Sequence, residues 1–351
     1  MTRAGHILTY AQSLKGGGVE RAMLRLTAQW LDLGRRVTLV VGIADGPLVH
    51  EVPPGADVVV LGSADYRALM ALPEQVRRTR PDVIFCPGSH YTAIAAWTRL
   101  RLGRACPPLV GKVSNAVKRP DFGTATAAGQ AIWLALHPRF LDRIVAMTPA
   151  SAQEAAKAMR LPPDRPSVIP NPPARPIPGA PALSLPPRYI LGVGRLAPQK
   201  RWDRLVAATA RLNQRVPLVI LGEGKEREAL QAQAQALGVS LVLPGHAADP
   251  LGAMGGAALL ALTSDFEGVP GVLREALSVG TPVVATNASP AVAEIIAHPT
   301  FGSIVGRDDA DGLVGALDYW LGDVARPAPV PPPGSDAGAR YLALFDSLMP
   351  A

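Results

Sequence analysis

Cysteine is scarce in this chain: the 351 residues include only Cys86 and Cys106. Two cysteines cannot build the disulfide framework of a small secreted domain, and they suit a reducing compartment better. Long apolar runs are missing too, since no stretch reaches the roughly 18 uninterrupted apolar residues of a membrane span. The first residues lack the apolar region and cleavage site of a signal peptide. We therefore expect a cytoplasmic protein without a spanning helix.

Aromatic residues are also few, at 5% of the chain. The arginines of the first half come in small clusters without interleaved aromatic platforms, and no reading helix accompanies them, which argues against a nucleic-acid partner. The clusters are Arg77, Arg78 and Arg80, and Arg99, Arg101 and Arg104.

Charge is distributed unevenly along the chain. Residues 1–175 carry 22 Lys or Arg and 12 Asp or Glu, whereas the remainder carries 13 and 16. The excess in the first half is either a solvated surface or a contact with something anionic, such as a phospholipid surface or a lipid phosphate. Ile94, Trp97, Leu100 and Leu102, which lie near arginines, are either a membrane-facing patch or core residues. Peripheral contact with an anionic membrane is therefore one of two open interpretations.

Short β-branched runs alternate with helical patterns in both halves of the chain. A chain of this length suggests two domains. Two serial strand–helix alternations predict two doubly wound parallel α/β sheets, each covered by helices on both faces, with a ligand cleft between the facing domains.

Proline-rich stretches mark the boundaries between these regions, because such stretches are extended and semi-rigid. One occupies Pro172 to Pro187 and another, "RPAPVPPPG", precedes a last helix at Ser335 to Met349. We expect a first domain over 1–175, a linker over 176–187, a second domain over 188–326, and a terminal helix within 334–351 that docks back on the first domain.

The segment "SDFEGVPGVLREALSVGTPVVAT" is the strongest chemical signal. Pro270 suits the first turn of a helix that ends near Val279, and the glycines beside it allow a ligand to approach. Free N–H groups at the helix start can hold a phosphate. Glu267, in the loop at the mouth, and Glu275, inside the helix, suit a hydroxyl-rich ligand, because carboxylates accept hydrogen bonds. The alternative is that the two glutamates serve only as a helix cap and as part of a solvated helix face.

A second signal is "YILGVGRLAPQKRWDRLVAA", in which Arg195 and Lys200 follow a strand that ends at Gly194. Two fixed cations there can neutralise a diphosphate leaving group without a metal. The glycines also match part of a dinucleotide-binding fingerprint. However, Pro198 interrupts the expected helix start and no acidic residue follows at the required distance, so a dinucleotide-dependent oxidoreductase is a distant alternative.

A third signal is the loop Gly16, Gly17 and Gly18 after the first predicted strand. These glycines allow the backbone to approach a ligand, and a helix begins near Val19. The loop is no Walker motif, because the following Lys and Ser or Thr are absent. A plain tight turn is the alternative.

Together, the segments "GGGVER", "VIPNP", "VGRLAPQKRWDRLVAA", "LGEGKEREAL", "LPGH" and "EGVPGVLREALSVGTPVVAT" resemble family 4 glycosyltransferases of the GT-B fold, and the resemblance covers nearly the whole chain. It implies a retaining, metal-independent, hexosyltransferase-like enzyme that uses a nucleotide-diphosphate sugar and no further cofactor. The acceptor would be a glycan or a lipid-linked molecule of the cell-envelope or exopolysaccharide type.

The same resemblance implies roles for individual residues. Arg195 and Lys200 would contact the diphosphate, Glu267 the donor-sugar hydroxyls and Glu275 the ribose, while the Gly16–Gly18 loop would approach the phosphates from the first domain. His90 lies where the family often has a histidine near the reacting centre, and a structural histidine is the alternative. The remaining donor-binding candidates are Gly194, Gly268, Val269, Pro270 and Gly271.

Departures from the family pattern put the preferred base and sugar in doubt. Arg201 stands where a glycine is usual, Ser289-Pro290 replaces a Gly-Gly pair, and prolines follow "IPN". Asp309 and Asp311 form an Asp-x-Asp, which we interpret as a helix start rather than a metal site. Other functions left open are a nucleotide-sugar epimerase of the same fold and an inactive nucleotide-sugar-binding module.

Overall fold

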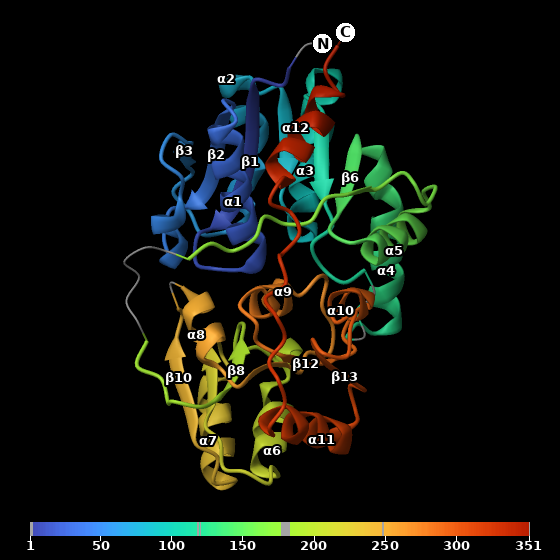
Figure 1. Ribbon diagram of the computed structural model, residues 1–351. Coiled ribbons are helices and arrows are strands. Elements are labelled where there is room, and N and C mark those ends of the chain that lie inside the picture. The colour runs from blue at the N-terminus through green and yellow to red at the C-terminus, as the bar shows by residue number, and fades with distance from the viewer. Residues whose placement is uncertain (1–2, 118, 120, 177–182, 248, 351) are drawn as a thin grey trace. The chain divides into compact units, whose positions relative to one another are not determined.

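The computed structural model describes residues 3–117, 119, 121–176, 183–247 and 249–350. The chain forms two compact units, Met1–Pro172 with Pro333–Ala351, and Pro173–Pro332 (Figure 1). Each unit contains one parallel sheet whose strands alternate with helices along the chain, which confirms the predicted α/β fold class. Part of the predicted linker, residues 177–182, lies outside the described residues.

The first unit has a seven-stranded sheet in the order β3-β2-β1-β4-β5-β6-β7. The chain winds outward from β1 to β3 and then returns to β4 on the other side of β1, so the winding direction changes between β1 and β4. Ligands of such sheets bind at this switch point, beyond the carboxyl ends of the strands. The strands are β1 (His6–Ser13), β2 (Arg36–Ile43), β3 (Asp57–Val60), β4 (Val83–Cys86), β5 (Leu109–Lys112), β6 (Arg143–Ala146) and β7 (Ser167–Val168). The helices are α1 (Gly18–Asp32), α2 (Leu72–Thr79), α3 (Thr92–Leu102), α4 (Thr124–Leu136), α5 (Pro149–Met159) and α12 (Ala337–Asp346).

The last helix, α12, belongs to this first unit although it is the C-terminal element of the chain. Its aromatic rings pack on those of α1 and β4: the Trp30 ring lies 6.0 Å from Tyr341 and 5.5 Å from Phe345 between centroids. Asp346 accepts a hydrogen bond of 2.8 Å from the backbone of Ala4 and pairs with Arg35 at 3.0 Å. The buried ring cluster and these polar contacts fasten the chain end to the first sheet.

The second unit has a six-stranded parallel sheet in the order β10-β9-β8-β11-β12-β13. Its winding direction changes between β8 and β11, which are hydrogen-bonded neighbours. Strands β9 and β11 are buried along their whole length, as expected for a sheet covered on both faces. The strands are β8 (Ile190–Val193), β9 (Leu218–Leu221), β10 (Leu241–Gly245), β11 (Leu259–Leu262), β12 (Val283–Thr286) and β13 (Gly302–Val305). The helices are α6 (Trp202–Ala210), α7 (Arg227–Ala236), α8 (Pro250–Gly256), α9 (Gly271–Ser278), α10 (Pro290–Ile295) and α11 (Ala310–Leu321).

Among the described residues, none of the helices combines the length and the apolar character that crossing a bilayer requires.

Candidate functional site

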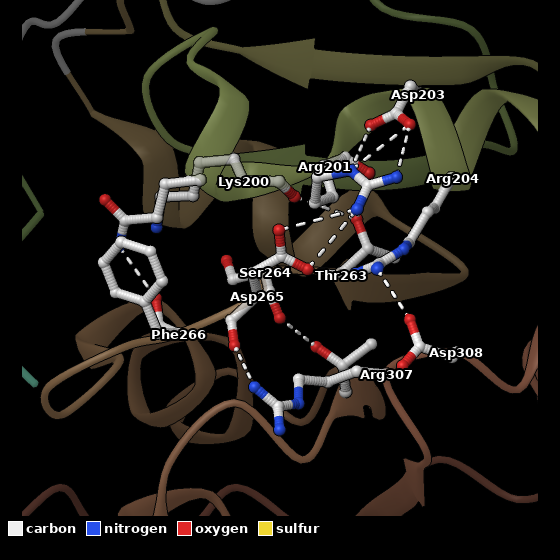
Figure 2. Close-up of polar contacts among 12 residues, drawn as sticks. Lys200, Arg201, Asp203, Arg204, Thr263, Ser264, Asp265, Phe266, Arg307 and Asp308 are labelled. Carbon is white, nitrogen blue, oxygen red and sulfur yellow. Dashed lines mark hydrogen bonds and ion pairs between the residues drawn. The ribbon is translucent and has the colours of Figure 1, made fainter. Parts of the chain in front are cut away.

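Two loops at the switch point of the second sheet carry most of the predicted donor-binding residues. One loop, 194–201, follows β8, and the other, 263–270, follows β11. Because the two strands are parallel neighbours, both loops leave the same edge of the sheet, and Figure 2 shows their side chains meeting there. Residues that are far apart in sequence thereby form one cluster.

Lys200 and Glu267 form an ion pair at the centre of this cluster. Lys200 Nζ lies 2.7 Å from Glu267 Oε1, and the Ser264 hydroxyl donates a hydrogen bond of 2.6 Å to the same oxygen. The two charged side chains are only 14% and 11% exposed, and such buried charges are tolerated when they are paired. Within the part of the chain that the structure describes, nothing donates a hydrogen bond to the second carboxylate oxygen, Oε2. That oxygen is therefore available to a ligand hydroxyl.

The glycines at the end of β8 provide the space for this arrangement. A Cβ on Gly192 would lie 2.8 Å from the Trp202 ring, and one on Gly194 would lie 3.0 Å from Cε of Lys200. Gly194 also has a φ of +154°. The Trp202 indole N–H donates a hydrogen bond of 2.9 Å to the Arg195 carbonyl, which fixes the loop beneath Lys200. These glycines thus have packing roles, so the partial dinucleotide fingerprint needs no dinucleotide to explain it.

Arg195 is the second cation at the end of β8. Its side chain is exposed, and no described residue pairs with its guanidinium, so it can bind an anion without first giving up an acidic partner. Lys200 differs, because its charge is already compensated by Glu267. The predicted pair of cations therefore consists of one held ammonium and one exposed guanidinium.

Helix α9 begins beside the loop that carries Glu267. Pro270 is its N-cap residue and Gly271 its first residue, close to the helix start predicted from the sequence. A Cβ on Gly271 would meet no atom within 4 Å, so protein packing does not require a glycine here. Glu275 lies in the second turn of α9. Gly268 and Val269 complete the connection between Glu267 and the helix.

A group of Arg–Asp ion pairs lies next to Lys200 and was not predicted from the sequence. Arg201 has φ 49° and ψ 44°, a left-handed conformation that costs a residue other than glycine about 1–2 kcal/mol. Its guanidinium contacts Asp203 at 2.9 Å and Asp265 at 3.5 Å, and Arg204 contacts Asp265 at 2.6 Å (Figure 2). Hydrogen bonding raises the pKa of Arg201, with Asp203 as the largest cause. The polar run after a buried strand, "TSDFE", was the available signal for Ser264 and Asp265.

The remaining candidates lie at the switch point of the first sheet. Gly16 and Gly17 have φ values of 115° and 158°, and a Cβ on Gly17 would lie 2.4 Å from Glu20 Oε2. Gly18 is the first residue of α1. His90, after β4, has an exposed side chain whose ring centroid lies 5.0 Å from that of Tyr66. The Gly16–Gly18 loop and His90 thus follow two neighbouring strands of the first unit.

The structure also shows the surroundings of the Asp309–Asp311 pair and of the apolar residues considered for a membrane patch. Asp309 caps α11, because its carboxylate accepts a hydrogen bond of 2.8 Å from the Gly312 amide, and Asp311 pairs with Arg211. In α3, Ile94 is 3% exposed and belongs to the core, whereas Leu100 is 75% exposed. Of these two residues of the arginine-flanked patch, Leu100 is therefore accessible to a membrane and Ile94 is not.

Comparison with known families decides the assignment. Residues 16–174 match the family described as Glycosyltransferase Family 4, and residues 177–328 match Glycosyl transferases group 1. The chain belongs to glycosyltransferase family 4. The switch-point cluster of the second unit lies within the group 1 match, and the Gly16–Gly18 loop opens the family 4 match.

Two curated relatives of this glycosyltransferase are each 33% identical to it. One is the N-acetylgalactosamine-N,N'-diacetylbacillosaminyl-diphospho-undecaprenol 4-alpha-N-acetylgalactosaminyltransferase of Campylobacter jejuni, aligned over 40% of this chain and 39% of the relative. The other is the GDP-mannose-dependent alpha-(1-6)-phosphatidylinositol monomannoside mannosyltransferase of Mycolicibacterium smegmatis, with 40% and 42% aligned. The matches thus span about two fifths of the relatives' own length.

A solved structure matches almost the entire glycosyltransferase. Anabaena HepE, crystallised in complex with UDP and glucose, aligns over 97% of each chain with a TM-score of 0.75 and 20% identity. At this identity the likeness shows the GT-B fold alone.

Proposed function

We propose that this glycosyltransferase transfers a sugar, with retention of anomeric configuration, from a nucleoside-diphosphate donor to a lipid-linked or glycan acceptor used in cell-envelope or exopolysaccharide synthesis. The observation that carries the proposal is the arrangement around Glu267. Lys200 and Ser264 hold one carboxylate oxygen, and the other oxygen accepts no hydrogen bond from the described residues. Two cations and a helix N-terminus lie in the adjoining loops.

In this proposal the second unit binds the donor. Arg195, Lys200 and the first N–H groups of α9 compensate the negative charge that develops on the diphosphate as it leaves. Glu267 accepts a hydrogen bond from a donor-sugar hydroxyl through Oε2, and Glu275 accepts one from the ribose. Because fixed protein charges supply this compensation, the proposed reaction requires no metal ion.

The first unit provides the remaining groups. We assign the Gly16–Gly18 loop to contact with the donor phosphates and His90 to the reacting centre, as the resemblance to the family implies. The bond between the sugar C1 and the phosphate oxygen breaks with its electron pair going to that oxygen. The acceptor hydroxyl then bonds to C1 on the same face and gives its proton to the departing phosphate, so no side-chain nucleophile takes part.

Support for a lipid-linked acceptor comes from the relatives. The Campylobacter enzyme is named for an undecaprenol-diphosphate acceptor and the Mycolicibacterium enzyme for a phosphatidylinositol monomannoside. The first unit also presents apolar and basic side chains together at α3. Leu100 is exposed, and the Arg101 guanidinium lies 5.2 Å from the Trp97 ring centroid. Such a surface suits peripheral contact with an anionic membrane.

A panel of nucleotide sugars tests the donor assignment through thermal stabilisation, because a donor binds only the folded chain. The panel consists of UDP-glucose, UDP-galactose, UDP-N-acetylglucosamine and GDP-mannose, with NADH as the control. One sugar nucleotide should raise the free energy of unfolding by about 2.7 kcal/mol at a hundredfold excess over its Kd. Stabilisation by NADH alone would contradict the proposal. Release of nucleoside diphosphate that depends on an added acceptor then separates a transferase from an epimerase or an inactive binding module.

A further inference from the structure

Arg201 occupies a backbone conformation that a glycine would adopt without strain. We therefore ask which contacts of its side chain offset that strain. It follows the short helical turn Pro198–Lys200 and precedes α6, with Lys200 as its direct neighbour. Its side chain is 32% exposed, and Asp203 and Asp265 flank its guanidinium. Two carboxylates therefore hold the Arg201 guanidinium, which is not a freely solvated surface charge.

Asp265 is the residue through which Arg201 reaches the other loop of the site. Arg204 Nη1 lies 2.6 Å from the Asp265 carboxylate, and Arg201 Nη1 lies 3.5 Å from both of its oxygens. Arg307 donates a hydrogen bond of 3.1 Å to the Asp265 carbonyl. Asp265 is two residues before Glu267, so three arginines converge on the loop that positions the Glu267 carboxylate (Figure 2).

Backbone contacts join the same two loops on either side of Lys200. The Asp265 amide donates to the Gln199 carbonyl at 2.9 Å, and the Gln199 side chain donates to the Phe266 carbonyl at 2.8 Å. The Thr263 hydroxyl lies 3.1 Å from the carbonyl oxygen of Lys200 and 3.0 Å from that of Arg201. The Lys200–Glu267 pair therefore bridges two loops that neighbouring contacts already hold together.

The charges of Arg201, Arg204 and Asp265 also compensate one another beside the Lys200–Glu267 pair. Asp265 is a second carboxylate close in sequence to Glu267, and Arg201 and Arg204 compensate it. We propose that Arg201 and Asp265 are positioning residues that fix the Lys200 ammonium and the Glu267 carboxylate in the geometry that the departing diphosphate requires. This inference rests on the proposed function, because it assigns Arg201 and Asp265 to the same diphosphate site.

The test compares Arg201→Gly and Asp265→Asn with a matched control, Arg211→Ala, which removes an Arg–Asp ion pair of the same unit outside the two loops. Arg201→Gly removes the side chain while suiting the backbone. Rates are measured as release of nucleoside diphosphate from the panel sugar nucleotide that the wild-type enzyme uses. We expect kcat to fall about tenfold to a hundredfold in both loop variants, because a misplacement of about 1 Å can cost a hundredfold. Affinity for the donor's nucleoside diphosphate should fall by less than kcat, the melting temperature should change little, Arg201→Lys should regain part of kcat, and Arg211→Ala should match wild type.

A double variant shows whether Arg201 acts through Lys200. In a Lys200→Ala background, Arg201→Gly should leave the residual rate unchanged, since the residue that it positions is gone. An equal fall in both backgrounds, or a wild-type kcat for Arg201→Gly, would overturn the positioning role. If Lys200→Ala alone keeps the wild-type rate, the diphosphate assignment itself fails. That outcome differs from one in which only the positioning role of Arg201 and Asp265 fails.

Discussion

At the scale of single residues, the site depends on how buried charges are compensated. Lys200 and Glu267 are both mostly buried, and each is the other's counter-charge. Removing one member of such a pair leaves the other uncompensated, which is why each matters beyond its own contact with a ligand. Arg195 has an exposed guanidinium, so it can bind an anion at a smaller desolvation cost.

The Lys200→Ala variant should lose transfer while the fold survives. Losing one preorganised contact to a developing anion typically costs about 3 kcal/mol in the transition state, or roughly a hundredfold in rate. Transfer rate and melting temperature measured on the same preparation check this expectation. A variant that keeps more than half the wild-type rate would show that Lys200 does not bind the diphosphate.

Lys112, at the end of β5, predicts a pH dependence of stability. Its side chain is 1% exposed and donates a hydrogen bond of 3.1 Å to Asn171, and burial lowers its pKa from 10.5 to about 8. Between these two pKa values the unfolded chain binds the proton more tightly, so Lys112 makes the protein more stable as the pH rises from about 8 to 10.5.

Urea denaturation across this pH range, with Lys112→Met and the exposed Lys157→Met as the control, isolates this contribution. The free energy of unfolding of wild type should rise relative to Lys112→Met with increasing pH, whereas its difference from Lys157→Met should stay constant. Burial also raises the pKa of Cys86 to about 11, which acts in the opposite direction. The Lys112 charge partly offsets that rise, so Lys112→Met leaves the opposing Cys86 effect at least as large as in wild type. Parallel curves for wild type and Lys112→Met would refute the assignment.

At the scale of elements, the site exists because β8 and β11 are neighbours. Apolar runs and helical spacing predicted the elements, and Pro270 predicted the start of α9, because both depend on local chemistry. Strand order depends on packing of the whole sheet, so the sequence did not reveal that Lys200 and Glu267 would pair. Glu267 was placed in a loop before the helix from sequence, and it lies there with 8% of the residue exposed. The Arg201–Asp265 ion pair was missed for the same reason, since Asp265 lies far away along the chain.

Gly271 tests the start of α9 as a phosphate-binding element. Because a Cβ there meets nothing in the protein, Gly271→Val should change the free energy of unfolding by only about 0.5 kcal/mol. A bulky side chain over the first N–H groups should nevertheless weaken binding of the donor's nucleoside diphosphate at least about tenfold, or about 1.4 kcal/mol. Isothermal titration with UDP or GDP, according to the donor that the panel identifies, measures this, and Gly315→Val in α11, whose Cβ also meets nothing, is the matched control. Equal affinities in both variants would exclude α9 from the diphosphate site.

At the scale of the whole molecule, the positive charges concentrate in the first half of the chain. Each Lys or Arg near an anionic bilayer contributes about 1 kcal/mol, and the attraction fades within a Debye length of about 8 Å at physiological salt. Three or four favourably placed arginines would therefore give weak, reversible and salt-sensitive attachment. Such attachment would present an amphiphilic acceptor to the enzyme.

Co-sedimentation with vesicles measures this attachment. Vesicles with anionic lipid should bind the protein at low salt and release it at high salt, while neutral vesicles should bind little. Reversing the charge of Arg101 and Arg104, which lie beside Leu100, should abolish binding, and reversing that of Arg211 in the second unit should not. Equal binding to both vesicle types, or to neither, would make the charge excess a solvated surface and favour a soluble acceptor.

The central claim is retaining transfer from a nucleoside-diphosphate sugar by fixed protein charges. Nuclear magnetic resonance of the product formed in excess EDTA tests it most directly, because the coupling constant of the anomeric proton reports the configuration of the new bond. From an α-configured donor, we expect an α-linked product formed at the same rate with or without EDTA. A β-linked product, or a reaction that stops in EDTA and resumes when magnesium or manganese is added, would contradict it.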